Sequence, residues 1–205
     1  MNTAKPIVFV VDDDTSFRTA ISRLLHAAGF SFRTFASATE FLQAPPTDQP
    51  GCIIVDLHMP GPSGLDFQTA LAKMEYPLPL IFLTGHGDIS ASVQAIKQGA
   101  EDFLTKPVTR EKLLETVQRA LAREAQERAR RTRQRELRAR LELITARERE
   151  VLALVISGRL NKQIAGDLNV CERTVKAHRA SLMTKLQVQS SAELGSLAQE
   201  MGIHA

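Results

Sequence analysis

The chain has 205 residues, of which 43% are apolar and 24% charged, which is ordinary for a globular protein of one larger domain or two small ones. Its apolar runs are too short for a membrane span or a signal peptide, so we expect no membrane contact. Its two cysteines stand far apart, so we expect neither a disulfide framework nor a zinc site, and a cytoplasmic location. Residues 1–122 carry 10 Lys/Arg and 13 Asp/Glu, a net charge of −3, whereas residues 123–205 carry 16 and 10, a net charge of +6. This asymmetry favours a second part that meets nucleic acid, although a merely solvated basic surface would have the same charge.

Apolar runs and helical patterns alternate through the first part of the chain. Three continuous apolar runs are typical of buried parallel strands: 7–11, 52–55 and 80–83. Two weaker runs predict strands nearer the edges of a sheet: 31–35 and 102–104. Apolar residues at helical spacing occur in four segments: 17–25, 65–71, 93–96 and 113–121. The alternation predicts an α/β fold with a doubly wound, five-stranded parallel sheet.

Three short stretches have the spacing of a capping box, in which a Ser or Thr and an acidic residue three positions later satisfy the first amides of a helix. They are Ser37 with Glu40, Ser63 with Asp66, and Thr145 with Glu148. We expect a helix to begin after each of them.

An arginine-rich segment follows at 123–140, with eight arginines, almost no apolar residue and neither Pro nor Gly. Its high helix propensity predicts that it continues the preceding helix as a solvated, charged linker. A coiled coil is the alternative, but the apolar heptad is too sparse to indicate one.

The last part of the chain has the pattern of a small helical unit. A first helix follows Thr145 and stops near Gly158, and "NKQIAGDL" and "CERTVKAHRASLMTKL" predict two more, separated by a short turn. This arrangement resembles a helix-turn-helix. Val175, Leu182 and Leu186 lie at core spacing. The candidate DNA contacts are polar residues of this last helix and of the helix before it: Lys162, Arg173, Thr174, Lys176, His178 and Arg179.

Polar residues follow four of the predicted strands, at the end where an open parallel sheet binds its ligands. They are Asp12, Asp13 and Asp14 after the first strand, Asp56 after 52–55, Thr84 after 80–83, and Lys106 after 102–104. One acidic run after a strand is ordinarily a solvated loop. Complementary groups at four corresponding strand ends instead favour a site.

The chemistry of these groups suits phosphoryl transfer. Clustered carboxylates with few competing nitrogen or sulfur ligands favour Mg²⁺, and an aspartate beside the cation can attack phosphorus to give an acyl phosphate. A lysine and a threonine hydroxyl can then bind the new phosphoryl oxygens.

The motifs "VVDDD", "IIVDLHMPGPSG", "LTGHG" and "DFLTKP" resemble the receiver domain of bacterial two-component response regulators, which has a flavodoxin-like fold. The resemblance implies that Asp56 is the phosphoacceptor and that Asp12 and Asp13 are the acidic pair, with Asp13 the more direct Mg²⁺ ligand. It further implies metal binding by Asp56 and the backbone carbonyl of His58, a switch formed by Thr84, Lys106 and Phe103, and a cis Lys106–Pro107 bond. Asp14 lies beyond the acidic pair, and its role stays open.

The C-terminal part resembles the LuxR-type DNA-binding domain of the NarL/FixJ class, most clearly in "NKQIA" and "TVKAH". Cys171 stands where that family often has a serine N-cap, and cysteine caps poorly, so we expect the following helix to fray at its start. Ala146 stands where proline is common. We expect three regions: a phosphoacceptor receiver domain at 1–122, a helical linker at 123–141 and a helix-turn-helix domain at 142–205.

The resemblance implies a phosphorylation-controlled transcriptional regulator rather than an enzyme, with a sensor histidine kinase and double-stranded DNA as partners, homodimerisation on phosphorylation, and RNA polymerase as a further candidate. A phosphatase of the haloacid dehalogenase kind also uses Asp and Mg²⁺, but it places a second Asp two residues after the nucleophile, where this chain has His58. Dinucleotide binding would need a G-x-G-x-x-G turn after the first strand, which is missing here.

Overall fold

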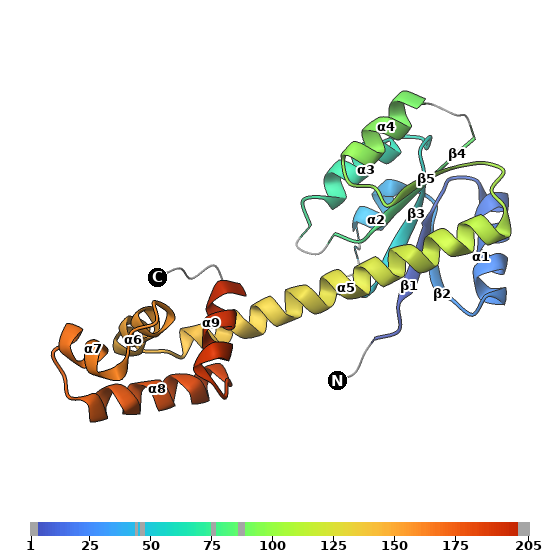
Figure 1. Ribbon diagram of the computed structural model, residues 1–205. Coiled ribbons are helices and arrows are strands. Elements are labelled where there is room, and N and C mark those ends of the chain that lie inside the picture. The colour runs from blue at the N-terminus through green and yellow to red at the C-terminus, as the bar shows by residue number, and fades with distance from the viewer. Residues whose placement is uncertain (1–3, 44, 46–47, 75–76, 86–88, 201–205) are drawn as a thin grey trace. The chain divides into compact units, whose positions relative to one another are not determined.

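The computed structural model describes residues 4–43, 45, 48–74, 77–85 and 89–200. They divide into two units, an N-terminal unit of residues 1–128 and a C-terminal unit of residues 129–205, and each is described by itself. The long helix α5 (Arg110–Glu142) contributes its first part to the N-terminal unit and its last part to the C-terminal unit (Figure 1).

The N-terminal unit is built on a five-stranded sheet in the order β2-β1-β3-β4-β5, with every neighbouring pair parallel. The strands are β1 (Ile7–Val11), β2 (Ser31–Phe35), β3 (Gly51–Asp56), β4 (Leu80–Thr84) and β5 (Asp102–Thr105). The three strands predicted from continuous apolar runs occupy the centre of the sheet, and the two weaker runs form its edges. The predicted doubly wound architecture is therefore confirmed.

Helices cover both faces of this sheet, which explains why its central strands are apolar throughout. Helix α1 (Thr15–Ala27) and the first part of α5 pack on the face that carries Val8 and Val10. The opposite face carries Phe9 and Val11 and is covered by three helices: α2 (Ala38–Gln43), α3 (Gly64–Leu71) and α4 (Ile89–Lys97) (Figure 1). Alternate residues of each strand thus enter two separate apolar clusters.

The cap at the start of α3 fixes the loop that follows Asp56. The predicted box is formed by Ser63 and Asp66, whose side chains bond each other's backbone amides. Gly64 begins the helix against the end of β3, where an added Cβ would lie 2.9 Å from both the Asp56 carbonyl oxygen and a ring carbon of Phe82. Only glycine allows this close approach without a shift of the strand end.

The other two predicted boxes differ in form. Thr145 and Glu148 make a complete capping box at the start of α6. At α2, the Ser37 hydroxyl accepts from the Glu40 amide, but Glu40 reaches the backbone N–H of Ala36 rather than that of Ser37.

Helix α5 is continuous over 33 residues, so the arginine-rich segment extends the preceding helix as predicted. It is not solvated along its whole length. Glu124 is buried and accepts from Arg128, which also bonds Asp48. Leu137 is buried too, as part of the C-terminal unit. The interpretation of this segment as an entirely solvated linker therefore needs correction at these positions.

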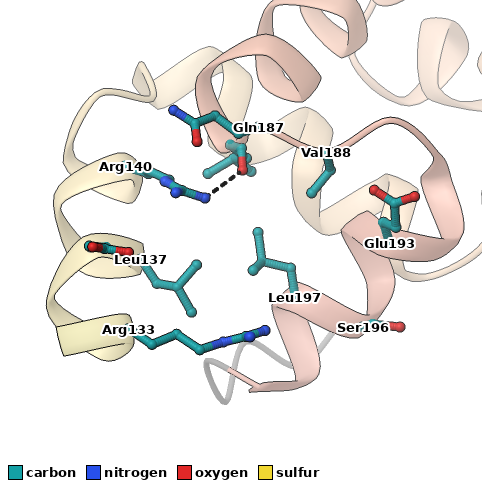
Figure 2. Close-up of a pocket in the computed structure, with 10 residues that line it drawn as sticks. Arg133, Leu137, Arg140, Gln187, Val188, Glu193, Ser196 and Leu197 are labelled. Carbon is teal, nitrogen blue, oxygen red and sulfur yellow. Dashed lines mark hydrogen bonds between the residues drawn. The ribbon is translucent and has the colours of Figure 1, made fainter. Parts of the chain in front are cut away.

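The C-terminal unit contains α6 (Ala146–Ile156), α7 (Asn161–Asp167), α8 (Glu172–Leu186) and α9 (Ser191–Glu200) around one apolar cluster. Gly158 ends the first of these helices with a positive φ of 80°, as its position predicts. Helix α9 was not predicted, although Ser190 and Glu193 cap it in the S-x-x-E pattern. A pocket separates α9 from the end of α5, and Leu137 and Leu197 face each other across it (Figure 2). None of the helices in the described ranges is long and apolar enough to cross a membrane.

Cys171 precedes α8 without a side-chain hydrogen bond to the helix amides. Its sulfur instead contacts Thr174 Oγ1 at 3.2 Å. We expect Cys171→Ser to stabilise the C-terminal unit by about 0.5–1 kcal/mol, because a serine hydroxyl can accept from an unsatisfied amide of the first turn. Urea unfolding of the two proteins measures the difference, and Cys171→Ala, which cannot cap, serves as the control. Equal stability of the Ser and Ala variants would contradict the capping argument.

Candidate functional site

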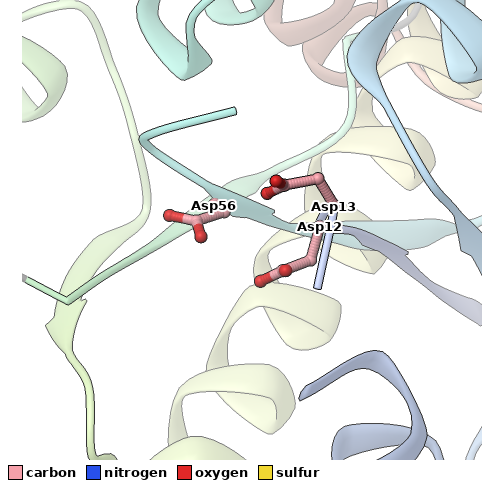
Figure 3. A group of neighbouring side chains, drawn as sticks. All are labelled: Asp12, Asp13 and Asp56. Carbon is pink, nitrogen blue, oxygen red and sulfur yellow. The ribbon is translucent and has the colours of Figure 1, made fainter. Parts of the chain in front are cut away.

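Three carboxylates converge at the carboxyl edge of the sheet (Figure 3). Asp12 follows β1 and Asp56 ends β3, and these two strands pair directly, with Val11 opposite Val55. Ligand oxygens of Asp12, Asp13 and Asp56 all lie within 4.8 Å of one another, and we call these three residues the acidic cluster. Asp12 is buried, Asp56 half-buried and Asp13 exposed, so the cluster is open to solvent on one side.

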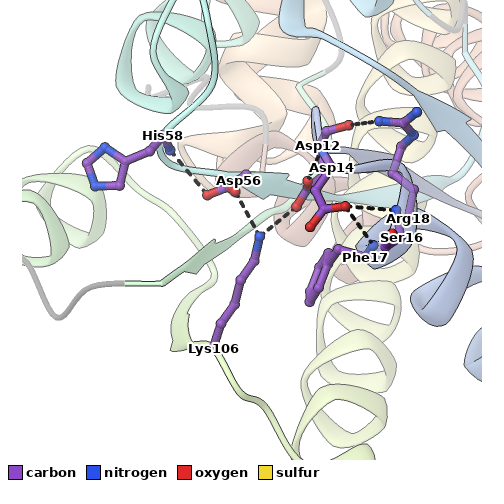
Figure 4. Close-up of polar contacts among 8 residues, drawn as sticks. All are labelled: Asp12, Asp14, Ser16, Phe17, Arg18, Asp56, His58 and Lys106. Atoms are coloured by element: carbon purple, nitrogen blue, oxygen red, sulfur yellow. Dashed lines mark hydrogen bonds and ion pairs between the residues drawn. The ribbon is translucent and has the colours of Figure 1, made fainter.

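Lys106 joins the acidic cluster from the loop after β5. Its Nζ donates to Asp12 Oδ2 at 2.7 Å and to Asp56 Oδ2 at 2.8 Å (Figure 4). Burial raises the pKa of Asp12, although its bond to Lys106 opposes this. Burial also lowers the pKa of Lys106, but the hydrogen bonds to the two aspartates outweigh it and the net shift is upward. The lysine is thus held as an ammonium between the carboxylates of Asp12 and Asp56.

Asp14 has a different task from its two neighbours. Its carboxylate caps α1 by accepting from the backbone amides of Ser16 (2.8 Å) and Phe17 (3.3 Å). Its own N–H donates to Asp12 Oδ1 at 2.8 Å, which orients that buried carboxylate. The role that the sequence left open is therefore structural, since Asp14 starts the helix and fixes the loop that carries the acidic pair.

The remaining residues of the predicted switch lie on neighbouring strands. Thr84 ends β4, is fully buried, and accepts through its carbonyl from the amide of Lys106. Phe103 on β5 stands opposite Phe82 in the sheet, with ring centroids 6.0 Å apart. His58 donates its backbone N–H to Asp56 Oδ1 at 3.2 Å. The Lys106–Pro107 peptide is cis, as the resemblance implied. The last two residues of "LTGHG" lie outside the described residues.

This arrangement suits a hard divalent cation and an incoming anion. The acidic cluster offers three carboxylates against one ammonium, and hard cations such as Mg²⁺ prefer oxygen ligands of this kind. The residues therefore fit the metal that the resemblance implies.

The candidate DNA contacts lie on α7 and α8 of the C-terminal unit. Lys162, Arg173 and Lys176 are exposed, whereas Thr174 and His178 are half-buried. Arg179 is also half-buried and donates to Asn161 Oδ1 at 2.8 Å, which ties the two helices together.

A buried ionic cluster in the same unit was missed from the sequence. Glu148 is 4% exposed and accepts from Lys185 Nζ (2.7 Å), Ser181 Oγ (2.6 Å) and the backbone amide of Thr145 (2.7 Å). The bonds from Lys185, then Ser181 and Thr145, lower the pKa of Glu148 to about 2. The capping-box spacing identified one of these contacts, but nothing in the sequence pairs Glu148 with residues of α8.

Comparisons with known proteins agree with this geometry. Residues 8–118 match the response regulator receiver domain, and residues 142–198 match the luxR family of bacterial regulatory proteins. The chain is 40% identical to Nodulation protein W of Bradyrhizobium diazoefficiens, over 99% of this chain and 89% of that protein. It is 36% identical to the transcriptional regulatory protein FixJ of the same species, over 98% of each chain.

Two solved structures support the same assignment. Response regulator StyR superposes with a TM-score of 0.90 at 44% identity, covering 96% of this chain and 100% of that one. Full-length FixJ from B. japonicum, at 34% identity, gives a TM-score of 0.60 and covers 99% and 100%. The relatives are transcriptional regulators rather than enzymes. The chain therefore belongs to the response regulators of the NarL/FixJ class, in which a receiver domain is joined to a LuxR-type DNA-binding domain.

Proposed function

We propose that Asp56 accepts a phosphoryl group from a sensor histidine kinase in the presence of Mg²⁺, and that this modification promotes dimerisation and DNA binding. The observation that carries the proposal is the position of Lys106 Nζ, bonded to both Asp56 and Asp12 beside the exposed carboxylate of Asp13. Mg²⁺ held by the acidic cluster and the His58 carbonyl would offset the negative charge that an approaching phosphoryl group meets.

The proposed transfer uses this chain's own residues as follows. A carboxylate oxygen of Asp56 forms the new bond to phosphorus, and the phosphorus–nitrogen bond of the kinase phosphohistidine breaks, with its electron pair passing to the imidazole. Lys106 and the Thr84 hydroxyl then bind phosphoryl oxygens. Phe103 is expected to turn inward behind Thr84 as that hydroxyl moves toward the phosphoryl group.

The proposed dimer surface is the face formed by α4 and β5, near Val93 and Ile96, which are 47% and 48% exposed, and Lys97. With Mg²⁺ and acetyl phosphate as donor, we expect light scattering at micromolar concentration to report a mass increase toward a dimer. Ile96→Ser should weaken this dimer, since burial of one such side chain contributes about 1.5–3 kcal/mol. Leu160→Ser removes a still more exposed apolar side chain (69% exposed) outside α4 and should leave the mass increase intact. An unchanged monomer with donor present would count against this surface.

We also propose that α8 enters the major groove of DNA with its N-terminal half. Lys176 is exposed on that half and is proposed to contact a base edge, with Arg173, His178 and Arg179 as further contacts. Lys162 on α7 and Thr174 are proposed to bind phosphates, which position the protein without reading sequence. A dimer should prefer an inverted repeat because the site shares its two-fold symmetry.

Lys176→Ala is expected to lower affinity for a site selected from random DNA by about 1–3 kcal/mol, with less loss on unrelated DNA. Lys162→Ala should weaken binding to both DNAs equally and reduce the salt slope by about one unit. Fluorescence anisotropy over a salt series measures both effects. Lys112→Ala, a lysine of the N-terminal unit, is the control and should change neither quantity. Equal losses on both DNAs for Lys176→Ala would make that residue a phosphate contact.

The class assignment supports three broader proposals. We propose a cytoplasmic location, RNA polymerase as a further partner, and functional boundaries near residues 122 and 142. The regions matched by the two families, 8–118 and 142–198, lie inside those boundaries.

A further inference from the structure

Lys106 has a third contact besides the two carboxylates. Its Nζ lies 3.9 Å from the centroid of the Phe17 ring, which is the geometry of a cation–π interaction (Figure 4). The periodicity of α1 places Phe17 among the apolar positions of that helix, and part of its side chain does pack against the cluster between α1 and α5. Its ring face, however, meets an ammonium group.

The backbone at Phe17 is tied to the same loop that carries the acidic pair. Asp14 accepts from the backbone amide of Phe17, and its own amide donates to Asp12. Arg18, the next residue of α1, donates through its guanidinium to the carbonyl of Asp12 and to Thr15 Oγ1. These hydrogen bonds fix the backbone of Phe17 relative to Asp12, and packing against the apolar cluster places its side chain.

We infer that Phe17 is a positioning residue for the proposed phosphoryl transfer, since its ring holds the Lys106 ammonium beside Asp56 before the donor arrives. A lysine side chain has four flexible methylene groups and a point charge, so its reach does not by itself define where the charge sits. An aromatic face below the ammonium and two carboxylates beside it restrict that freedom in the folded protein. Less ordering then remains to be done when phosphoryl oxygens bind. This inference rests on the proposed function of Asp56.

The test separates the contact from its effect on the reaction. In the full-length protein with isotope-labelled lysine, the ε-methylene protons of Lys106 should show an upfield ring-current shift that is lost in Phe17→Leu. The rate of Asp56 labelling by saturating acetyl phosphate and Mg²⁺ should fall about threefold to tenfold in Phe17→Leu, as expected for loss of one cation–π contact in a partly buried site. The donor concentration at half-maximal rate should change little, and Phe17→Tyr should restore both the shift and the rate.

Phe30→Leu is the matched control, because Phe30 packs against the same apolar cluster but follows the opposite end of α1. Its labelling rate should equal that of the parent. If Phe17→Leu does not fold, Phe17→Met replaces it. An absent ring-current shift in the parent protein overturns the inference directly, and this reading does not depend on phosphorylation. If the parent shows the shift but Phe17→Leu is labelled at the parental rate, the inference is also overturned. Failure of the parent to be labelled at Asp56 overturns the proposed function itself.

Discussion

Asp56→Asn is expected to abolish phosphoryl labelling of this protein by acetyl phosphate and Mg²⁺, because the amide removes the carboxylate that would attack phosphorus. The parent should gain one acid-labile phosphoryl group, visible by intact mass and lost on acid treatment. Asp13→Asn should still label but should need a higher Mg²⁺ concentration, since one of the three carboxylates of the acidic cluster is gone.

Asp14→Ser provides a matched control for the loss of an acidic residue from this loop. Serine retains the capping function that Asp14 performs for α1, so the helix start should persist while one negative charge is lost. We expect near-parental labelling. Labelling of Asp56→Asn at the parental level, on another residue, would refute Asp56 as the phosphoacceptor.

Glu148→Gln is expected to destabilise the C-terminal unit by about 2–3 kcal/mol, because it leaves Lys185 without its anionic partner in a largely buried site. The effect should depend on pH in a defined direction. The pKa of Glu148 falls from an ordinary 4.5 to about 2 on folding. The stabilisation is therefore complete above about pH 4.5 and is lost as the pH falls toward 2, so the parent and Glu148→Gln should converge in acid.

Urea unfolding of the full-length protein at several pH values measures this difference, and hydrogen exchange locates it in residues 146–186. Glu150→Gln is the matched control: Glu150 pairs with Arg147 on the same helix, but its side chain is 53% exposed. Exposed pairs contribute at most about 1 kcal/mol. A loss in Glu148→Gln that stayed constant down to pH 2 would disprove the ionic origin of the effect.

The sequence predicts the sheet and the acidic cluster well because both follow from one-dimensional patterns. Continuous apolar runs mark β1, β3 and β4, and parallel strands bring the residues that follow them to one edge. The convergence of Asp12, Asp13, Asp56 and Lys106 could be predicted for that reason.

Contacts between side chains of different elements could not be predicted in the same way. Periodicity places Phe17 in a core but does not reveal that its ring lies against Lys106, and no spacing rule connects Glu148 with Lys185, 37 residues later. Leu137 is similar, since a single apolar residue among arginines carries no periodic signal. The capping role of Asp14 and the existence of α9 could have been predicted, because a capping pattern precedes each of the two helices.

The charges gathered around Lys106 couple cation binding to phosphorylation. Three carboxylates and one ammonium give the site a formal charge of −2, which a divalent cation neutralises. Conversion of the Asp56 carboxylate to an acyl phosphate would replace its charge of −1 by a charge of about −1.5 to −2. The phosphorylated pocket would thus attract the cation more strongly than the free pocket. By thermodynamic reciprocity, the cation would then favour the phosphorylated state to the same degree, so the equilibrium fraction of phosphorylated protein should rise with the free Mg²⁺ concentration.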